Sequence, residues 1–227
     1  MKTSLVLFAI ITLLGLTVYP QEIRVIETGT FHGGEIEAKD GDIWLGLYKQ
    51  GDSNMLLPSV LSVVSVYDAI VDAEGESSGK RITVPGMAEP LFIIKGEGFV
   101  QARPVFTFEE FSGEIDPGAG ISFRMEHTEY TLQIESEKKG EGGFVQDGSS
   151  LILSNGKIQQ TIYRVKECSF CRWRIDWIGD LDSDGKPDLY LYLTHHYNIA
   201  NQKLFLSSKA GSGKLVKEVA EFTTTGC

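Results

Sequence analysis

The sequence predicts a mainly β protein built from antiparallel sheets, either sandwich-like or α+β with few helices. Apolar and polar residues alternate with a period of two through much of the chain, which is typical of half-buried strands. Glycine, aspartate and proline residues separate these alternating segments, as turns do. Stretches with the three-to-four-residue periodicity of a helix are few. We therefore expect many short strands joined by tight turns.

The first half of the chain predicts strands of irregular spacing, at residues 42–48, 58–67, 81–84 and 91–94. The second half is more regular. Residues 121–135 predict a hairpin that turns near His127-Thr128, and residues 151–163 predict a second hairpin around Asn155-Gly156. Asn-Gly supplies the positive φ angles of a type I′ turn, so we expect that turn here.

The last third of the chain predicts four more strands. Trp173, Ile175 and Trp177 recur at every second position, which places them on one face of a strand. The next strand alternates leucines with polar or aromatic residues over 189–194, and residues 203–207 and 215–222 form two final strands. Exposed aromatic residues could line a sugar- or peptide-binding face, for which Tyr190 and Tyr192 are the best candidates.

The N-terminus predicts a signal peptide over residues 1–20. A positively charged start precedes an apolar run from Leu5 to Leu16. A run of about a dozen residues fits the ~7–15 of a signal peptide and is shorter than the ~20 needed to span a bilayer. We expect an exported protein, periplasmic or secreted, with no membrane span in the mature chain; an uncleaved anchor is the alternative.

Glycine and charged residues are concentrated over 137–147, which predicts a loop or linker. It would separate a β-rich N-terminal region, residues 21–136, from a β-rich C-terminal region, residues 148–227. The sequence is compatible both with two packed subdomains and with one continuous domain.

The formal net charge of −10 disfavours nucleic acid and anionic lipid as partners, because both select basic surfaces.

Three cysteines, Cys168, Cys171 and Cys227, predict a disulfide in an oxidising compartment. A bond from either of the first two to Cys227 would close a long loop and stabilise the fold by about 4 kcal/mol in the chain-entropy model. The spacing of Cys168 and Cys171 is also that of a redox motif, although strand-like flanks disfavour that role. The sequence leaves the pairing open.

The most informative segment runs from Asp180 to Asp188. Carboxylates occupy its first, third, fifth and ninth positions, and Gly185 occupies the sixth. Such spacing lets a tight loop turn several oxygen ligands toward one Ca²⁺. Without a cation, four carboxylates packed so closely would repel one another strongly. The alternative is an aspartate-rich turn that binds nothing.

Residues 179–189 (GDLDSDGKPDL) resemble the calcium-binding loop of FG-GAP and VCBS-type repeats. The resemblance covers about residues 177–193 and implies a Ca²⁺ site with Gly185 at its bend. Its implied ligands are the side chains of Asp180, Asp182, Asp184 and Asp188 and the backbone carbonyl of Lys186. Members of that family carry several copies arranged as propeller blades, whereas one copy is recognisable here, so we expect no full propeller. An EF-hand is excluded because its twelfth position needs a Glu and Leu191 stands there.

No convincing catalytic constellation accompanies the loop in the sequence. We therefore expect a structural Ca²⁺ in an exported protein with a binding or adhesion role at the cell envelope, toward an unidentified extracellular or envelope ligand. The alternative is a secreted or periplasmic hydrolase of polysaccharide or peptide that calcium stabilises. The oligomeric state cannot be predicted.

Overall fold

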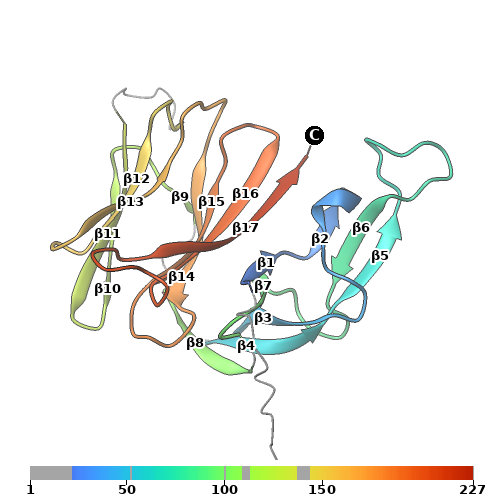
Figure 1. Cartoon of the computed structure of the whole chain (residues 1–227), viewed down its shortest axis with the longest axis horizontal. Helices are drawn as coiled ribbons and strands as arrows, with labels where there is room; N and C mark the ends of the chain where they lie inside the picture. Colours follow the sequence, from blue (N-terminus) through green and yellow to red (C-terminus); the bar gives the residue numbers. More distant parts are fainter. Residues whose placement is uncertain (1–21, 52, 100, 109–112, 137–143, 227) are drawn as a thin grey trace, which may run out of the picture.

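The computed structural model describes residues 22–51, 53–99, 101–108, 113–136 and 144–226. Over this part of the chain it contains seventeen strands, β1–β17, and one short 3-10 helix, η1 (Gly33–Glu35). Every strand pairing is antiparallel, which confirms the expected fold class (Figure 1). The expected signal peptide, residues 1–20, lies outside the described residues. Among those described, no helix is both long and apolar enough to cross a membrane.

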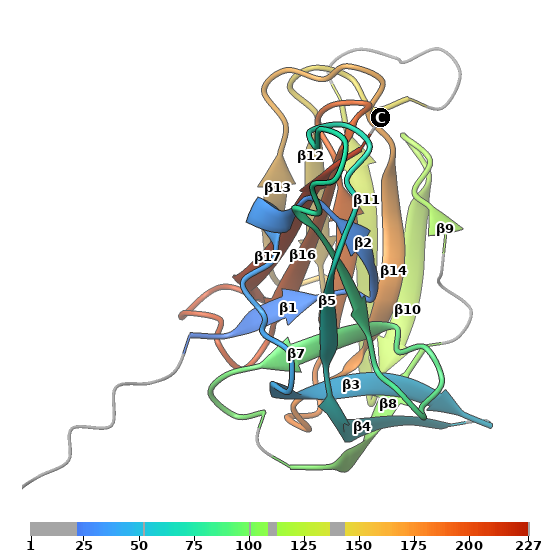
Figure 2. The same cartoon turned by 90° about the vertical axis from the view of Figure 1, so that its right-hand side faces the viewer.

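One long, curved sheet runs through both halves of the chain. Its strand order is β1-β7-β3-β4-β8-β14-β15-β16-β17, with β9 also beside β14. The curvature brings its first strand back close to its last, so that the sheet is nearly closed (Figures 1 and 2). In that order the strands are Arg24–Ile26, Phe92–Lys95, Ile43–Gln50, Ser53–Val60, Arg103–Thr107, Trp173–Asp180, Asp188–Leu193, Ile199–Leu206 and Lys217–Thr225, and β9 is Gly113–Glu114.

Two smaller sheets flank the curved one. The first has the order β10-β11-β12-β13, with strands Gly120–Met125, Thr128–Glu135, Ser150–Ser154 and Gln159–Arg164. The second has the order β2-β6-β5, with strands Gly29–Phe31, Gly79–Thr83 and Ser62–Val66. Figure 1 shows the two on opposite sides of the molecule, the first at the left, next to β14–β16, and the second at the right, beside η1.

Hydrophobic residues form two cores, one on each face of β14–β16. One core fills the inside of the curved sheet and includes Phe92, Tyr190 and Leu204. The other lies between the curved sheet and β10–β13 and includes Trp173 and Leu151. Strands β14–β16 therefore have a core on each face, which explains why the leucines and most of the aromatic residues in them have little exposed surface.

A bulge in β14 changes the expected placement of its aromatic residues. The register with β15 shifts between Ile175 and Trp177, so that Asp176 is the extra residue. Because a bulge reverses which side successive residues face, Trp173 and Ile175 lie in the outer core whereas Trp177 lies in the inner one. The prediction that all three share one face is wrong. Tyr190 is also not a surface residue, because it is 1% exposed.

The hairpin expected near His127-Thr128 is present, and its turn consists of Glu126 and His127. The hairpin around Asn155-Gly156 is present too, but its type I′ turn is not. Ser154 pairs with Gln159, which leaves a four-residue loop in which only Gly156 has a positive φ. The Asn155 side chain instead accepts hydrogen bonds from the backbone N–H groups of the two residues after Gly156.

The expected boundary at residues 137–147 falls between two strands that pair with each other. Five residues of β11 pair with five residues of β12 across this segment, from Thr131 opposite Ser154 to Glu135 opposite Ser150. The curved sheet likewise combines strands from 21–136 with strands from 148–227. The two expected regions thus share two sheets. Most of the Gly-rich segment, residues 137–143, lies outside the described residues.

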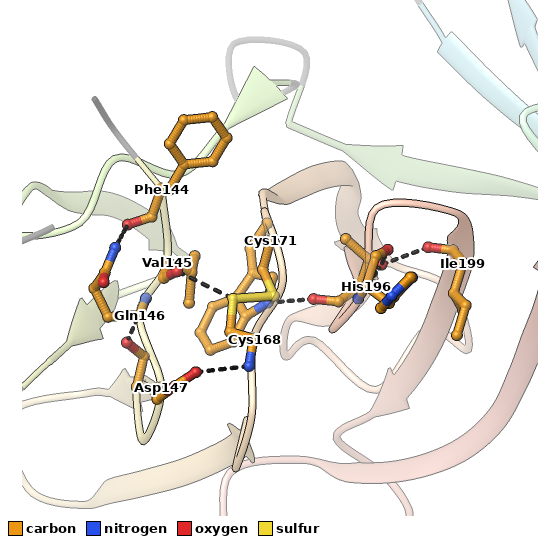
Figure 3. The surroundings of a disulfide bond; sticks show 11 residues. Phe144, Val145, Gln146, Asp147, Cys168, Cys171, His196 and Ile199 are labelled. Carbon is orange, nitrogen blue, oxygen red and sulfur yellow. Dashed lines mark hydrogen bonds between the residues drawn. A yellow bond between two sulfur atoms is a disulfide. The ribbon is translucent and has the colours of Figure 1, made fainter. Parts of the chain in front are cut away.

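The disulfide joins Cys168 to Cys171. The alternative, a bond from one of these to Cys227, does not form, because both sulfur atoms are already used; Cys227 itself lies outside the described residues. Figure 3 shows the bond between the Phe144–Asp147 segment and the loop that carries His196. Val145 pairs with Cys171 on one side, and the N–H of Ser169 donates to the carbonyl of His195 at 3.1 Å on the other. The disulfide thus fixes a junction of three loops.

Candidate metal centre

The acidic segment is the connection between β14 and β15. Asp180 is the last residue of β14 and Asp188 is the first of β15. Gly179 pairs with Asp188 in the antiparallel register, so the two ends of the loop lie side by side. Residues nine positions apart in an extended chain would be far from each other, whereas a hairpin returns the second to the first. The hairpin therefore explains how the segment can form one site.

Three of the predicted ligands come together. One carboxylate oxygen each from Asp180, Asp182 and Asp188 lies within 4.8 Å of the others. Calcium–oxygen distances are about 2.3–2.6 Å, so two ligands of one ion lie at most about 5 Å apart. The distances between these three oxygens are therefore short enough for all three to bind one Ca²⁺. The hard, anionic oxygen donors are also the type that this ion requires.

Asp188 is the innermost carboxylate, with no exposed surface. Its Oδ2 accepts a hydrogen bond from the N–H of Leu181, and its Oδ1 accepts one from the N–H of Ser207, both at 2.8 Å. Burial in the first place, and then the neighbouring charge of Asp182, raise its pKa to about 8, although the two hydrogen bonds lower it. A negative charge at this position is therefore costly unless a cation lies beside it.

Asp182 has a buried carboxylate oxygen without a hydrogen-bond partner among the described residues. That oxygen is Oδ1, whereas Oδ2 accepts a hydrogen bond from the hydroxyl of Ser208. Burial raises the pKa of this carboxyl, and the charges of Asp184 and Asp180 raise it further. Buried polar atoms in proteins are nearly always paired. A cation held by the cluster would pair this oxygen.

Asp180 shapes the loop as well as contributing to the cluster. Its Oδ1 accepts from the N–H of Asp184 and its Oδ2 from the N–H of Gly185, both at 3.0 Å. These bonds pull the chain into a tight turn in which Ser183 and Gly185 have φ of 66° and 78°. Glycine adopts that conformation without strain. The expected bend thus occurs at Gly185.

Asp184 lies beside the cluster rather than within its three close oxygens. Its Oδ1 accepts from the N–H of Lys186 at 2.9 Å and from the hydroxyl of Ser207 at 2.8 Å, and its Oδ2 is 3.6 Å from the Lys186 ammonium. The ligand roles of Asp184 and of the Lys186 carbonyl therefore stay predictions. In the structure both residues support the loop through hydrogen bonds and charge.

Sequence reasoning missed three residues that hold the site. Ser207 and Ser208 follow β16 directly and bind the carboxylates of Asp188, Asp184 and Asp182. The guanidinium of Arg103 donates two hydrogen bonds to the carbonyl of Leu181, at 3.1 and 2.9 Å. All three come from other parts of the chain, brought near by the pairing of β15 with β16 and of β14 with β8. No local motif marks them.

A second acidic pair lies on the inner face of the curved sheet. Glu27 accepts a hydrogen bond from the hydroxyl of Tyr190 at 3.0 Å, and Asp176 accepts one from Arg174 at 2.5 Å. Burial raises the pKa of both carboxyls, and the charge of Asp176 also raises that of Glu27. The two carboxylates therefore interact electrostatically, and Asp176 Oδ2 is buried with no partner among the described residues.

Comparison with protein-family models, with curated proteins and with solved structures finds no match to this chain. The chemistry of the sites must therefore be inferred from their own geometry.

Proposed function

We propose that this chain is an exported β protein that binds one structural Ca²⁺ at the loop between β14 and β15, with a binding or adhesion role at the cell envelope. The observation that carries the calcium proposal is the buried, unpartnered Oδ1 of Asp182 within a cluster of three carboxylates. A turn that binds nothing would not need to bury such an oxygen beside two other acids.

Electrostatics favours a divalent cation in this place. The buried Asp188 carboxyl with its raised pKa shows that the cluster disfavours the charged form of its own members. An ion of charge +2 would reverse this preference and keep the carboxylates ionised. Calcium suits the loop better than magnesium because it accepts irregular oxygen shells, whereas Mg²⁺ demands near-ideal octahedral geometry.

The location of the site supports a structural role for the ion. Leu181, at the start of the loop, belongs to the inner core, and Leu189, just after its end, belongs to the outer core. The loop also bonds to the two serines that follow β16. Calcium bound here would tie together three consecutive strands at the point where the two cores meet, and so stabilise the folded chain.

Calorimetric titration of Ca²⁺ into the metal-free protein, with Mg²⁺ as the control ion, tests the proposal. We expect one site that prefers Ca²⁺, and a loss of at least about tenfold in affinity for Asp182→Asn, because affinity depends on ligand charge. Asp116→Asn is the matched control, since Asp116 is an exposed turn residue away from the loop. Unchanged binding in Asp182→Asn would contradict the assignment.

The export and envelope parts of the proposal rest on the apolar leader at residues 5–16 and on the acidic composition. They are tested by finding whether the chain leaves the cytoplasm and whether the exported form has lost its first residues, read by N-terminal sequencing. Deleting residues 1–20 should keep the protein in the cytoplasm. Export without these residues would contradict this part.

The hydrolase alternative is favoured by one observation, the interacting pair of Glu27 and Asp176. A buried carboxyl with a raised pKa can keep the proton that a general acid donates, and the second carboxyl of an interacting pair can act as the base. If the pair is catalytic, Glu27→Gln should abolish hydrolysis of aryl glycosides and leave Ca²⁺ affinity unchanged. Absence of any hydrolysis by the wild-type protein would reject this candidate.

A further inference from the structure

A hollow of about 290 Å³ lies at the opposite end of the β14–β15 hairpin from the acidic loop. Its volume is at the small end of the range for ligand pockets, about 300–1,000 Å³, so it suits one small unit or the end of a longer molecule. We call it the aromatic–arginine hollow. Its lining residues are Glu114, Phe170, Arg172, Arg174, Tyr192, Thr194 and Tyr197.

Two strongly exposed aromatic side chains flank this hollow. Phe170 and Tyr197 are each 70% exposed. Single exposed aromatic residues are common on protein surfaces, but two at one hollow form a surface on which a ring can pack. Phe170 is held in a left-handed backbone conformation, with φ of 57°, between the two bonded cysteines.

The same junction of loops fixes both aromatic residues. Ser169 precedes Phe170 and pairs with His196, the residue before Tyr197, in a short parallel bridge. The Cys168 N–H donates to the carboxylate of Asp147 at 2.7 Å, as Figure 3 shows. The exposed rings therefore stand on backbone that a disulfide and several hydrogen bonds hold in place. Such preorganisation lowers the entropic cost of binding.

Two arginines supply the polar part of the hollow. Arg172 binds both oxygens of Glu114, at 2.8 and 3.1 Å, through one nitrogen, and its side chain is 50% exposed. Arg174 uses its Nε for Asp176, and its guanidinium lies 4.7 Å from the centre of the Tyr192 ring. A guanidinium has five N–H donors, so each arginine keeps further donors that no described residue accepts from. Each arginine is paired with one carboxylate, Arg172 with Glu114 and Arg174 with Asp176, so the hollow offers a ligand these remaining donors.

The strand beneath the hollow has no free edge. Arg174 pairs with Tyr192 of β15 on one side and with Glu114 of β9 on the other. An extended peptide therefore cannot pair with β14 itself by main-chain hydrogen bonds, which is one common way for a sheet to bind peptide. At this strand, recognition would come from side chains.

We propose that the aromatic–arginine hollow binds a saccharide unit that carries a carboxylate. The carboxylate would bind the arginine donors, which match its planar geometry, and the apolar face of the sugar ring would pack on Tyr197 or Phe170. The inference names a ligand class for the proposed binding role but stands on the hollow alone. It does not depend on the calcium loop, which lies at the other end of the hairpin.

An NMR titration with methyl β-glucuronide, against methyl β-glucoside as its uncharged counterpart, tests this proposal. The indole N–H of Trp173 is a suitable reporter because it donates to the carbonyl of Thr194, a lining residue, at 3.1 Å. We expect a saturable shift with the glucuronide, equal in Ca²⁺ and in EGTA, and a much weaker one with the glucoside. Because the shift should be the same with and without Ca²⁺, this test can succeed or fail independently of the calcium proposal.

Arg172→Ala and Tyr197→Ala should each weaken the binding at least about fivefold, a loss typical of a contacting arginine or aromatic residue. Their matched controls are Arg24→Ala, another half-exposed arginine paired with a glutamate, and Tyr67→Ala, another exposed tyrosine. The controls should bind as the wild type does. The proposal is overturned if the glucuronide causes no saturable shift, if the controls weaken binding equally, or if N-acetylaspartate amide binds as tightly as the glucuronide.

Discussion

The carboxylate of Asp188 accepts a hydrogen bond from the backbone N–H of Ser207 at 2.8 Å, although the two residues are 19 positions apart. The two residues are not neighbours in the sequence. The pairing of β15 with β16 brings them together. The bond makes the acidic loop part of a junction of three strands.

The hydroxyl of Ser207 positions the loop through Asp184, whose Oδ1 it approaches at 2.8 Å. Ser207→Ala removes this bond and keeps the backbone bond to Asp188. We expect Ca²⁺ affinity to fall by about tenfold, because partners that orient ligands typically contribute ~10–100-fold. Calorimetry measures the change. Ser53→Ala is the control, since Ser53 is exposed and its hydroxyl donates to the carbonyl of Gln50 at the end of β3. Equal affinities for all three proteins would show that Ser207 does not support the site.

Gly185 and Gly156 have nearly the same backbone angle, with φ of 78° and 79°, but different surroundings. A Cβ at Gly185 would lie 3.1 Å from a carboxylate oxygen of Glu126, whereas one at Gly156 would meet no atom within 4 Å. Both Gly→Ala variants should lose about 1–2 kcal/mol of stability, the cost of a left-handed non-glycine residue. Only Gly185→Ala should also weaken Ca²⁺ binding. Urea unfolding and calorimetry together decide this, and a Gly156→Ala variant with impaired Ca²⁺ binding would refute the distinction.

Reduction of the disulfide should destabilise the chain only modestly. Cys168 and Cys171 close a ring of four residues, for which the chain-entropy model gives about 2 kcal/mol, against about 4 kcal/mol for a long loop to Cys227. Urea unfolding of the oxidised and reduced protein, both in a Cys227→Ser background, measures the difference. Complete loss of the disulfide effect in that background would show that the stabilising bond involves Cys227.

His32 and Asp68 form a pair whose contribution depends on pH. The His32 Nδ1 lies 2.5 Å from Asp68 Oδ2, and this hydrogen bond raises the pKa of His32 and lowers that of Asp68. The charge of Glu35 also raises the His32 value. A raised histidine pKa contributes stability that is full below its unfolded value, about 6.5, and is lost as pH rises through the folded value. A lowered aspartate pKa contributes stability above about 3.9 that is lost as pH falls further.

The wild type should therefore exceed His32→Gln in stability most clearly between about pH 4 and 6.5. The difference should shrink at alkaline pH, as the pH rises through the raised folded-state pKa of His32 and the imidazole loses its proton there too. Urea midpoints within the acidic range and at alkaline pH provide the measurement. A stability difference that stays constant between them would mean that the charge of His32 has no role.

The sequence predicts the fold class because period-two alternation depends only on neighbouring residues. It also predicts the bend at Gly185 and the three clustered aspartates, since these lie within one short loop. It does not predict the Asp176 bulge, because a single inserted residue leaves the apolar pattern of Trp173 and Trp177 intact while reversing the face of one of them.

Long-range pairing accounts for the rest of what the sequence did not predict. Ser207, Ser208 and Arg103 reach the loop only through strand neighbours that no local pattern specifies. The aromatic–arginine hollow likewise combines β9, β14, β15 and two loops. The cysteine pairing could not be chosen either, because the spacing of three cysteines fits more than one arrangement.

The most direct test of the calcium proposal is the thermal melt of the mature protein in excess EGTA and again in millimolar Ca²⁺, with Mg²⁺ as a control. An ion that binds only the folded chain stabilises it by about 2.7 kcal/mol at 100 times its Kd, which corresponds to a rise in Tm of roughly 5–10 °C for a domain of this size. We predict such a rise with Ca²⁺ and a much smaller one with Mg²⁺. Identical melting temperatures in EGTA and Ca²⁺ would contradict the account and leave the acidic loop as a surface turn.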